Sequence, residues 1–359
     1  MSSKYSKVMI IGGGPAGSIC ASVLCELGCS EVEILERWQR GHDKPCGGGL
    51  SPRALKELRR LELIDMIRPK ASVIMGAHLL TPGGQHPKVS VGQIGMVIRR
   101  GELDELLLQH AEQLGAKVTT GVEVDRLIER KGRVVGVAAG EAEWEADVVV
   151  VATGARKRLC WDPRPRPRLD AVIARYKDVD VEPDMMHVYY HRSVAPYYTW
   201  LFPEPGGAAN VGVFRKSGPG QPRLTEVLDK LVAECFPQLD GAERVGRTRG
   251  HPIIYSHQAR HLVRPGAVRV GEAAWLTDAF TGEGIWHALI SGDEAARAIA
   301  AGDLERYQRR AEDVFDPALR NADRLVRFAN SPAWSWMLRI STLPVFATIL
   351  GRIMGGFGE

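Results

Sequence analysis

The segment spanning residues 8–36 constrains the fold of this chain more than any other. An apolar run at residues 8–11 leads directly into Gly12-Gly13-Gly14-Pro15-Ala16-Gly17, and residues 18–27 have the character of a helix. A second apolar run at residues 32–35 ends on Glu36. This order of strand, G-x-G-x-x-G turn, helix, strand and acid predicts a unit that binds the diphosphate of a dinucleotide.

Each glycine of the turn has a separate expected role. Gly12 takes the tight turn after the strand, where a side chain would clash. Gly14 lets the backbone approach a pyrophosphate, and Gly17 lets the helix pack closely on the strand. The helix start at Ala16 then offers N–H groups and the positive end of the helix dipole to the phosphates.

The acid that ends the second strand narrows the choice of cofactor. Glu36 is placed to accept hydrogen bonds from both hydroxyls of a ribose, which suits FAD or NAD. Arg37 beside it leaves NADP open, because an arginine in this position accommodates a 2′-phosphate.

Composition excludes several other classes of protein. A chain of 359 residues has room for about two or three domains. Its 45% hydrophobic and 25% charged residues are typical of a soluble globular protein. A net charge of +4 is too small to indicate a nucleic-acid partner. Neither a signal peptide nor an apolar stretch long enough to span a bilayer is evident, so a cytoplasmic location is expected.

The cysteines indicate a reducing compartment and no metal site. They form no C-x-x-C pair, and three of them surround the first predicted helix, where they are expected to pack as small apolar residues. The full set is Cys20, Cys25, Cys29, Cys46, Cys160 and Cys235.

Periodicity along the rest of the chain predicts an interrupted α/β fold. Residues 71–95 alternate like a sheet, residues 100–114 are helical, and the apolar strand at 147–151 ends in Ala152-Thr153-Gly154. Further strands are expected at 122–128, 134–139, 170–176, 186–191, 198–202, 210–214 and 267–270, and further helices at 52–61, 224–235, 281–300 and over most of 304–353. We therefore expect a discontinuous dinucleotide-binding domain (1–168 and 256–302), a β-rich domain (169–255) and a C-terminal helical region (303–359).

This arrangement resembles the FAD domain of the glutathione-reductase-type flavoproteins. The resemblance rests on the interrupted domain, the strand that ends at Ala152-Thr153-Gly154, and the late strand followed by a glycine-rich helix start. More closely, it is similar to the branch that includes aromatic hydroxylases and geranylgeranyl reductases, and it extends to about residue 292. It implies a Rossmann-like FAD-binding domain interrupted by a β-sheet substrate domain.

The resemblance also implies positions for the parts of FAD. Arg100 would lie near the phosphates, Val124 on the adenine side, and Glu272 at the ribityl chain, although these families usually have Asp in that position. Backbone N–H groups of residues 281–285 would lie near the flavin pyrimidine ring, where they stabilise negative charge on reduced flavin. The implied cofactor-binding set is Gly12, Gly14, Ala16, Gly17, Glu36, Arg37, Cys46, Gly47, Gly49, Arg100, Val124, Ala152, Gly154, Gly271, Glu272, Gly282, Gly284 and Ile285.

Two further motifs resemble the geranylgeranyl reductase signature. One is Lys44-Pro45-Cys46-Gly47-Gly48-Gly49-Leu50-Ser51, and the other is Tyr198-Thr199-Trp200-Leu201-Phe202-Pro203 followed by Asn210-Val211-Gly212. The resemblance implies an FAD-dependent reductase of isolated double bonds in the isoprenoid chain of a lipid, a quinone or a chlorophyll-like substrate. Alternation places Tyr198, Trp200 and Phe202 on one sheet face, which suits a core or an apolar substrate tunnel equally.

The expected reaction transfers hydride from N5 of reduced flavin to one alkene carbon and a proton to the other. Cys46 is the candidate acid by its position in the motif, and Gly47 and Gly49 would let the loop lie against the flavin ring; the alternative is that Cys46 only packs there. With no second G-x-G-x-x-G unit in the chain, the reductant is expected to be NAD(P)H that docks transiently or a small electron carrier.

Other functions and partners remain open from the sequence. Residues 331–357 combine aromatic and aliphatic residues with arginines, which predicts contact with a membrane surface, a helical cover of the core or a dimer contact. The rival functions are an aromatic or quinone monooxygenase, a flavin-dependent halogenase, whose W-x-W-x-I-P signature residues 198–203 partly match, and a non-catalytic FAD- or lipid-binding protein.

Overall fold

The computed structural model describes residues 5–81, 84–85, 89–165, 167–334 and 336. The chain divides into two compact units, which we call the first and the second unit. The first unit comprises residues 1–42, 101–167 and 254–321, and the second comprises residues 43–100, 168–253 and 322–359. Residues 43–100 therefore group with the β-rich part, whereas the expected division placed them with the dinucleotide-binding part. The reason is that strands in this segment hydrogen-bond into the sheet of the second unit.

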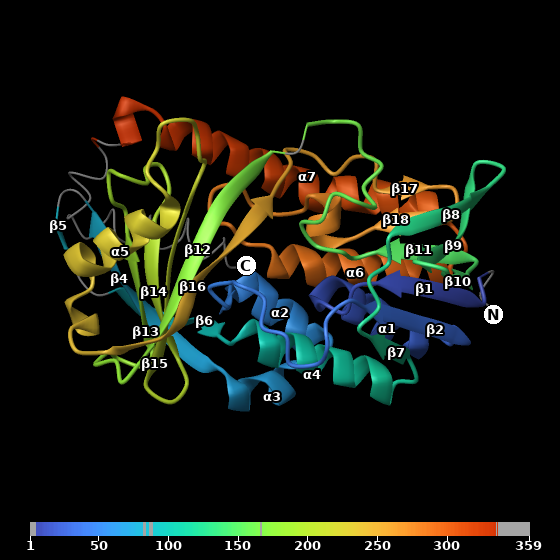
Figure 1. The fold of residues 1–359 in the computed structure, drawn as a ribbon, viewed down its shortest axis with the longest axis horizontal. Helices are drawn as coiled ribbons and strands as arrows, with labels where there is room; N and C mark the ends of the chain where they lie inside the picture. Colours follow the sequence, from blue (N-terminus) through green and yellow to red (C-terminus); the bar gives the residue numbers. More distant parts are fainter. Residues whose placement is uncertain (1–4, 82–83, 86–88, 166, 335, 337–359) are drawn as a thin grey trace. The chain divides into compact units, whose positions relative to one another are not determined.

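The first unit is built on a mostly parallel sheet with the strand order β17-β18-β11-β1-β2-β7. Its members come from distant parts of the chain, as their blue, green and orange colours show (Figure 1). Every strand pair is parallel except β17 with β18. The strand bounds are β1 (Lys7–Ile11), β2 (Glu31–Glu36), β7 (Lys117–Thr120), β11 (Val148–Val151), β17 (Val263–Arg264) and β18 (Ala267–Arg269).

Helices pack closely on this parallel sheet. All four valines of β11 are buried, as expected for a strand covered on both faces. Helices α1 (Pro15–Glu26) and α6 (Ile285–Ala300) approach each other so closely that a Cβ at Gly292 would lie 2.4 Å from the Ala16 carbonyl oxygen.

A smaller antiparallel sheet, ordered β10-β9-β8, is formed by β8 (Arg126–Arg130), β9 (Arg133–Ala139) and β10 (Ala142–Glu145). The strand expected at residues 122–128 begins later, at Arg126, so residues 122–125 lie outside β8.

Two further helices belong largely to the first unit. Helix α4 (Arg100–Gln113) matches the expected helix at 100–114. The long helix α7 (Leu304–Ala329) begins in the first unit, and its last residues belong to the second. The short 3-10 helix η3 (Gly271–Ala274) follows β18.

The second unit is built on a large, mostly antiparallel sheet with the order β16-β12-β15-β14-β13-β4-β6-β3, and β5 pairs with β4. Strands β13 and β4 form a parallel pair within it. The bounds are β3 (Gly49–Leu50), β4 (Ser72–Thr81), β5 (Gly84–Gln85), β6 (Val89–Val97), β12 (Arg168–Lys177), β13 (Met185–Tyr189), β14 (Thr199–Glu204), β15 (Ala208–Arg215) and β16 (Glu243–Ile254).

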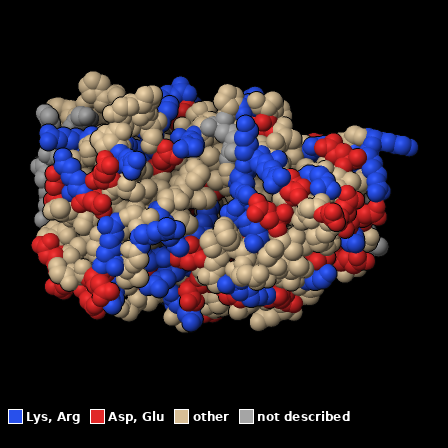
Figure 2. Space-filling view, in the orientation of Figure 1, with Lys and Arg blue, Asp and Glu red and all other residues tan. Residues whose placement is uncertain are grey.

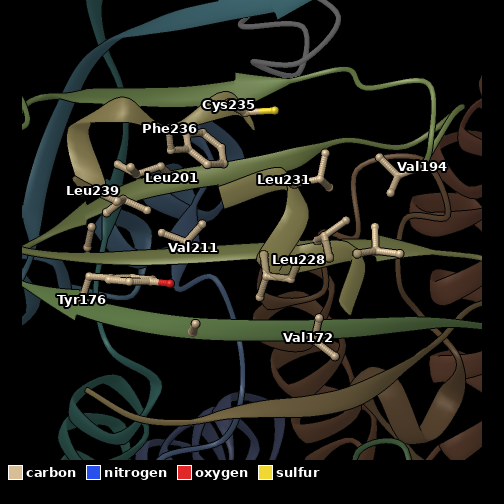
Figure 3. Packing of buried hydrophobic residues seen from close by; sticks show 14 of the residues in the cluster. Val172, Tyr176, Val194, Leu201, Val211, Leu228, Leu231, Cys235, Phe236 and Leu239 are labelled. Carbon is tan, nitrogen blue, oxygen red and sulfur yellow. The ribbon is translucent and has the colours of Figure 1, made fainter. Parts of the chain in front are cut away.

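One face of the large sheet carries the apolar core of the second unit. Helix α5 (Leu224–Cys235) has the expected bounds and packs Leu228 and Leu231 against Leu201 and Val211 of the sheet (Figure 3). Because side chains alternate along a strand, Trp200, Phe202 and Asn210 must point to the opposite face. That second face carries the polar and aromatic residues described below.

Short helices complete the second unit. Helix α2 (Pro52–Arg60) begins as its sequence predicts, because the Ser51 hydroxyl accepts a hydrogen bond from the Ala54 N–H at 3.2 Å and Pro52 occupies the first turn. The others are α3 (Ile64–Ile67), η1 (Arg68–Lys70) and η2 (Pro237–Leu239).

The C-terminal segment expected to be amphipathic lies mostly outside the described residues, which end at 334 and 336. Within the described part of the chain, no helix combines the length and the apolarity needed to cross a bilayer. Figure 2 shows Lys and Arg interspersed with Asp and Glu across the visible face.

Candidate active site

The glycine-rich turn of the first unit has the geometry that its spacing predicts. Gly12 has a φ of +107°, and a Cβ there would lie 2.5 Å from the Ala152 carbonyl oxygen. A Cβ at Gly17 would lie 2.0 Å from the Gly12 carbonyl oxygen, so only glycine permits this approach of α1 to β1. The tight turn and the close packing of helix on strand are therefore confirmed.

The start of α1 is left open toward an anionic ligand. The N-cap residue Gly14 supplies no side-chain hydrogen bond, and the first turn contains no acidic residue. First-turn N–H groups of a helix attract anions because they lack partners within the helix and lie at the positive end of its dipole. The start of α1 thus fits the diphosphate of a dinucleotide.

Glu36, at the end of β2, has a second role that the sequence did not indicate. Its Oε2 accepts a hydrogen bond from the Gly13 N–H at 2.7 Å, and its Oε1 accepts one from the Trp38 N–H at 2.9 Å. The carboxylate therefore holds the glycine turn and the end of β2 together. Its expected contact with a ribose stays a prediction.

Arginines lie beside this carboxylate. The Arg37 guanidinium packs over the Trp38 ring at 4.7 Å from its centroid, and Arg156 pairs with Glu123 at 2.5 Å. Burial and the neighbouring charge of Arg156 lower the pKa of Arg37, which nonetheless keeps its charge at neutral pH.

The late part of the first unit contains a second tight glycine turn. Gly271 has a φ of +57°, and its N–H donates to the Ser291 hydroxyl at 2.8 Å. Glu272 accepts a hydrogen bond at Oε1 from the Ile254 N–H at 3.2 Å, so one of its oxygens is directed at the backbone. Its proposed contact with the ribityl chain would use the other oxygen.

The loop before α6 is longer than the sequence predicts. Asp278 Oδ1 accepts hydrogen bonds from the N–H groups of Phe280 and Thr281, both at 2.8 Å. These bonds hold the backbone in a turn, so α6 begins at Ile285 and not at Thr281. Gly284 caps α6 without a side-chain hydrogen bond, and the first turn of α6 also lacks an acidic residue.

The remaining expected cofactor residues occupy defined places. Val124 is buried in an apolar cluster with Val134 and Val149. Gly154 has a φ of +64° in the segment after β11, and Arg100 is the buried first residue of α4. Two tight glycine turns, two helix starts without a side-chain cap and a carboxylate at a strand end together fit FAD; the contact of each residue with it stays a prediction.

The aromatic residues of the second unit form a continuous row on one sheet face. The ring centroids of Tyr198 and Trp200 lie 6.2 Å apart, and those of Trp200 and Phe202 lie 5.9 Å apart. Tyr198 lies just before β14 and still contacts this row. Trp200 is buried, whereas Tyr198 and Phe202 are partly exposed. The predicted common face is therefore observed, and its outer rings are accessible to an apolar ligand.

A glycine of the neighbouring strand sets the position of the Trp200 ring. Gly212 pairs with Trp200 across β14 and β15, and a Cβ at Gly212 would lie 2.2 Å from Cζ2 of the ring. The indole therefore lies flat across the space that Gly212 leaves. The ring also donates from Nε1 to the Asn210 Oδ1 at 3.0 Å.

The segment 46–49, which we call the Cys46 loop, packs on this aromatic row. A Cβ at Gly47 would lie 3.1 Å from Nε1 of Trp200, and one at Gly49 would lie 3.4 Å from Cε2 of Phe202. Gly48 has a φ of +72°, and a Cβ there would lie 2.2 Å from the Ile98 carbonyl oxygen. The half-buried Cys46 thiol is thus carried by a loop that requires glycine at position 48.

An ion-pair network holds the chain just before the Cys46 loop. Asp43 pairs with Arg175 and also with Arg249, the latter at 2.8 Å. Arg175 continues to the buried Glu204 at 3.0 Å, and Glu204 pairs with Arg99 at 2.8 Å. Burial opposes the charge on Arg175, but its bonds to Asp43 and Glu204 outweigh burial and raise its pKa.

Sequence reasoning missed Asn210 and the Asp43 network as parts of this site. Asn210 belonged to a recognised motif, and strand alternation alone would have placed it on the face of Trp200. No local pattern pointed to the network, because Asp43 and Arg249 are separated by 206 positions.

Comparison with known proteins gives matches over both units. An FAD binding domain model matches residues 5–159, and a geranylgeranyl reductase catalytic domain model matches residues 170–250. The chain is 32% identical over 334 residues to digeranylgeranylglycerophospholipid reductase 1 of Methanopyrus kandleri, covering 86% of each chain. It is 29% identical over 336 residues to the digeranylgeranylglycerophospholipid reductase of Methanosarcina acetivorans, covering 87% of this chain and 80% of that one.

Solved structures share the fold. A geranylgeranyl bacteriochlorophyll reductase-like protein from Thermoplasma acidophilum matches with a TM-score of 0.78 at 23% identity, covering 96% of this chain and 98% of that chain. A flavin-dependent brominase matches with a TM-score of 0.77 at 21% identity, covering 98% and 94% of the two chains. Identities this low speak to the fold alone.

The glycine turns of the first unit and the matching domain model define an FAD-dependent oxidoreductase with a discontinuous α/β cofactor domain. Within that class, the chain belongs to the geranylgeranyl reductase family. Membership does not favour the monooxygenase, halogenase or non-catalytic alternatives.

Proposed function

We propose that this protein hydrogenates isolated C=C bonds in the isoprenoid chain of a lipid. The observation that carries this proposal is the row of Tyr198, Trp200 and Phe202 with a thiol-bearing glycine loop packed on it. An apolar chain without polar groups is bound by aromatic and aliphatic surface. The relatives are named digeranylgeranylglycerophospholipid reductases, and these names support the same substrate class.

When bound and reduced, FAD supplies a hydride, and the residues of this chain must supply the rest of the reaction. Saturating one C=C bond adds a hydride to one carbon and a proton to the other. The alkene has no adjacent carbonyl to stabilise charge, so the two transfers must be well aligned and shielded from water.

Cys46 is the proposed proton donor. Its Sγ accepts a hydrogen bond from the Gly48 N–H at 3.4 Å, which leaves the S–H group free to donate elsewhere. Release of the proton to the alkene carbon leaves a thiolate at Sγ, and the Gly48 N–H stabilises that charge. A proton from water then restores the thiol for the next turnover.

Replacement of Cys46 tests this role. Positioned acids contribute about 10²–10⁴-fold to rate, so we expect Cys46→Ala to lower kcat at least about hundredfold on a geranylgeranyl lipid. The measurement is mass spectrometry of the lipid, which gains about two mass units for each bond reduced. The FAD content of the purified variant, read from its absorbance, should equal that of the wild type. Full turnover by Cys46→Ala would remove Cys46 as the acid.

The reductant is proposed to be NAD(P)H or a small electron carrier. Among the described residues, the first unit has one glycine-rich turn of the dinucleotide type, at residues 12–17. A nicotinamide would therefore dock transiently. Anaerobic mixing with NADPH distinguishes the donors, because bleaching of the flavin absorbance marks direct reduction and its absence points to the carrier.

Membrane contact by residues 331–357 is the remaining part of the proposal. Trp334 is buried between Tyr190 and Phe328, with ring centroids at 5.9 Å from each, while Trp336 is 66% exposed. The segment thus starts as a cover on the second unit and then presents an aromatic side chain to its surroundings. Flotation with liposomes, with and without the residues after Asn330, separates membrane contact from a purely covering role.

A further inference from the structure

The side chain of Asn210 connects the aromatic row to the Cys46 loop. Asn210 is fully buried in β15, and its Oδ1 accepts the hydrogen bond from Trp200 Nε1 at 3.0 Å. Its Nδ2 donates to the Cys46 carbonyl oxygen at 2.9 Å, across 164 positions of sequence. One amide group therefore contacts both of the motifs that define the site.

The chemistry of the two neighbours fixes the orientation of this amide. The indole N–H of Trp200 only donates, so it must face the amide oxygen of Asn210. The Cys46 carbonyl only accepts, so it must face the amide NH₂ group. The Trp200 ring is itself held in the space beside Gly212. The indole and the Asn210 amide therefore cannot turn together into another orientation.

The bond to the Cys46 carbonyl bears directly on the position of the thiol. The Cys46 backbone is tied at its carbonyl by Asn210, and its Sγ is tied by the Gly48 N–H. Gly48 is in turn fixed by its carbonyl, which accepts from the Ile98 N–H at 3.0 Å. Removing the Asn210 bond would free the end of the Cys46 loop that carries the thiol.

We propose that Asn210 is a positioning residue, which sets where the Cys46 Sγ releases its proton. The inference rests on the proposed acid role of Cys46, because a fixed thiol matters only if that thiol reacts. Asn210 acts through the backbone of Cys46 and through the Trp200 ring, and it takes no proton itself.

A double-mutant cycle in the FAD-loaded enzyme tests the proposal. We expect Asn210→Leu to lower kcat about tenfold, since both oriented hydrogen bonds of the amide are lost, and any rise in KM reports the freed Trp200 ring. In a Cys46→Ala background the same substitution should have no further effect on kcat, because the group that it positions is gone.

Thr199→Val is the matched control for this cycle. Thr199 is also fully buried in the same sheet, where its hydroxyl donates to the Gly212 carbonyl oxygen at 2.7 Å on the opposite face from Asn210. Its loss should lower the stability of the sheet and leave kcat within about twofold of the wild type. An equal kcat loss from Asn210→Leu in both backgrounds would overturn the inference and leave the role of Cys46 standing. Full turnover by Cys46→Ala would instead remove Cys46 as the acid, and a wild-type enzyme that leaves the isoprenoid lipid unreduced would overturn the proposed function.

Asn210→Asp adds a readout in pH. Burial raises the pKa of a carboxyl group, so at low pH the new side chain is protonated and its OH replaces the Nδ2 donor to Cys46. At higher pH the Asp side chain ionises. A carboxylate oxygen then faces the Cys46 carbonyl oxygen, and neither can donate a hydrogen bond. We expect the ratio of variant to wild-type kcat to fall as pH rises, whereas Asn210→Leu should show a flat ratio. A flat ratio for Asn210→Asp would count against the positioning role.

The reactivity of the thiol gives a measurement independent of turnover. In flavin-free protein, the rate at which iodoacetamide alkylates Cys46 is followed by mass spectrometry of the peptide. We expect Asn210→Leu to change this rate several-fold, about 3- to 10-fold, and Thr199→Val to leave it unchanged. Equal rates in all three proteins would contradict the proposal. This test remains valid even if Asn210→Leu is too unstable for a turnover assay.

Discussion

At the scale of single residues, His187 shows what the apolar face of the large sheet imposes on a polar side chain. It lies on β13 and stacks on His78 with ring centroids 4.6 Å apart, and its Nε2 has no hydrogen-bond partner among the described residues. Burial and the neighbouring charge of His78 lower the pKa of His187 from 6.5 to about 4, against a smaller opposing effect of Glu182. The folded protein therefore keeps His187 neutral.

This shift predicts a loss of stability in acid. The unfolded chain binds a proton at His187 below pH 6.5, whereas the folded chain does so only below about 4. The free energy of unfolding should therefore fall as pH drops through this window, by up to about 3 kcal/mol from this residue. Urea unfolding between pH 7 and pH 4 should show a shallower decline for His187→Leu than for the wild type. Equal declines would mean that His187 is not the group responsible.

At the scale of elements, the pairing of β14 with β15 builds the aromatic surface. Trp200 fits because its cross-strand partner is Gly212, and Asn210 and Phe202 are paired two residues along the same two strands. Glycine usually weakens a strand, but an aromatic ring laid over it restores burial. In this strand pair, a small residue on β15 therefore defines the position of an aromatic ring on β14.

Gly212→Ala should disrupt the packing of Trp200 on this strand pair. The added methyl would lie 2.2 Å from Cζ2 of Trp200, so the indole must move and its bond to Asn210 must break. We expect the variant to lose about 1–3 kcal/mol of stability and to show a raised KM for the isoprenoid lipid. Tryptophan fluorescence and steady-state kinetics measure the two effects.

Gly218→Ala is the control, because a Cβ there would have no atom within 4 Å. It should match the wild type in both measurements. A Gly212→Ala protein with unchanged fluorescence and KM would show that Trp200 does not depend on the glycine.

At the scale of the whole molecule, the expected site residues are divided between the two units. The glycine turn, Glu36, Gly271 and the start of α6 all belong to the first unit. The aromatic row, the Cys46 loop, Asn210 and the Asp43 network all belong to the second. The dinucleotide turn and the Cys46 loop are therefore built on different sheets.

Binding of FAD by the folded first unit should raise the stability of the protein. A ligand at about 100 times its Kd adds about 2.7 kcal/mol, so the Tm of flavin-free protein should climb with added FAD. Gly17→Ala should abolish most of this increase, because a Cβ at that position would lie 2.0 Å from the Gly12 carbonyl oxygen. Differential scanning fluorimetry provides the measurement, and Gly218→Ala should keep the full increase. A Tm that rises equally in Gly17→Ala would mean that the turn does not bind the cofactor.

Much of the local structure was predictable because it depends on neighbouring residues. The β1–α1–β2 segment, the cap of α2 at Ser51 and the bounds of α5 followed from patterns that span about 30 positions or fewer. The start of α6 was predicted four residues too early, at 281 instead of 285, because the Asp278 turn competes with the helix for the backbone. Strand β16 was not foreseen, since Glu243–Ile254 is rich in arginine and shows little apolar alternation.

By itself, then, the sequence determined the dinucleotide turn, the type of most elements and the family, because glycine spacing and side-chain periodicity act over short distances. Only the tertiary structure decided that residues 43–100 join the large sheet and that Asn210 meets Cys46 across 164 positions. Strand order sets these contacts, and a single sequence leaves strand order open because every strand offers the same backbone hydrogen bonds.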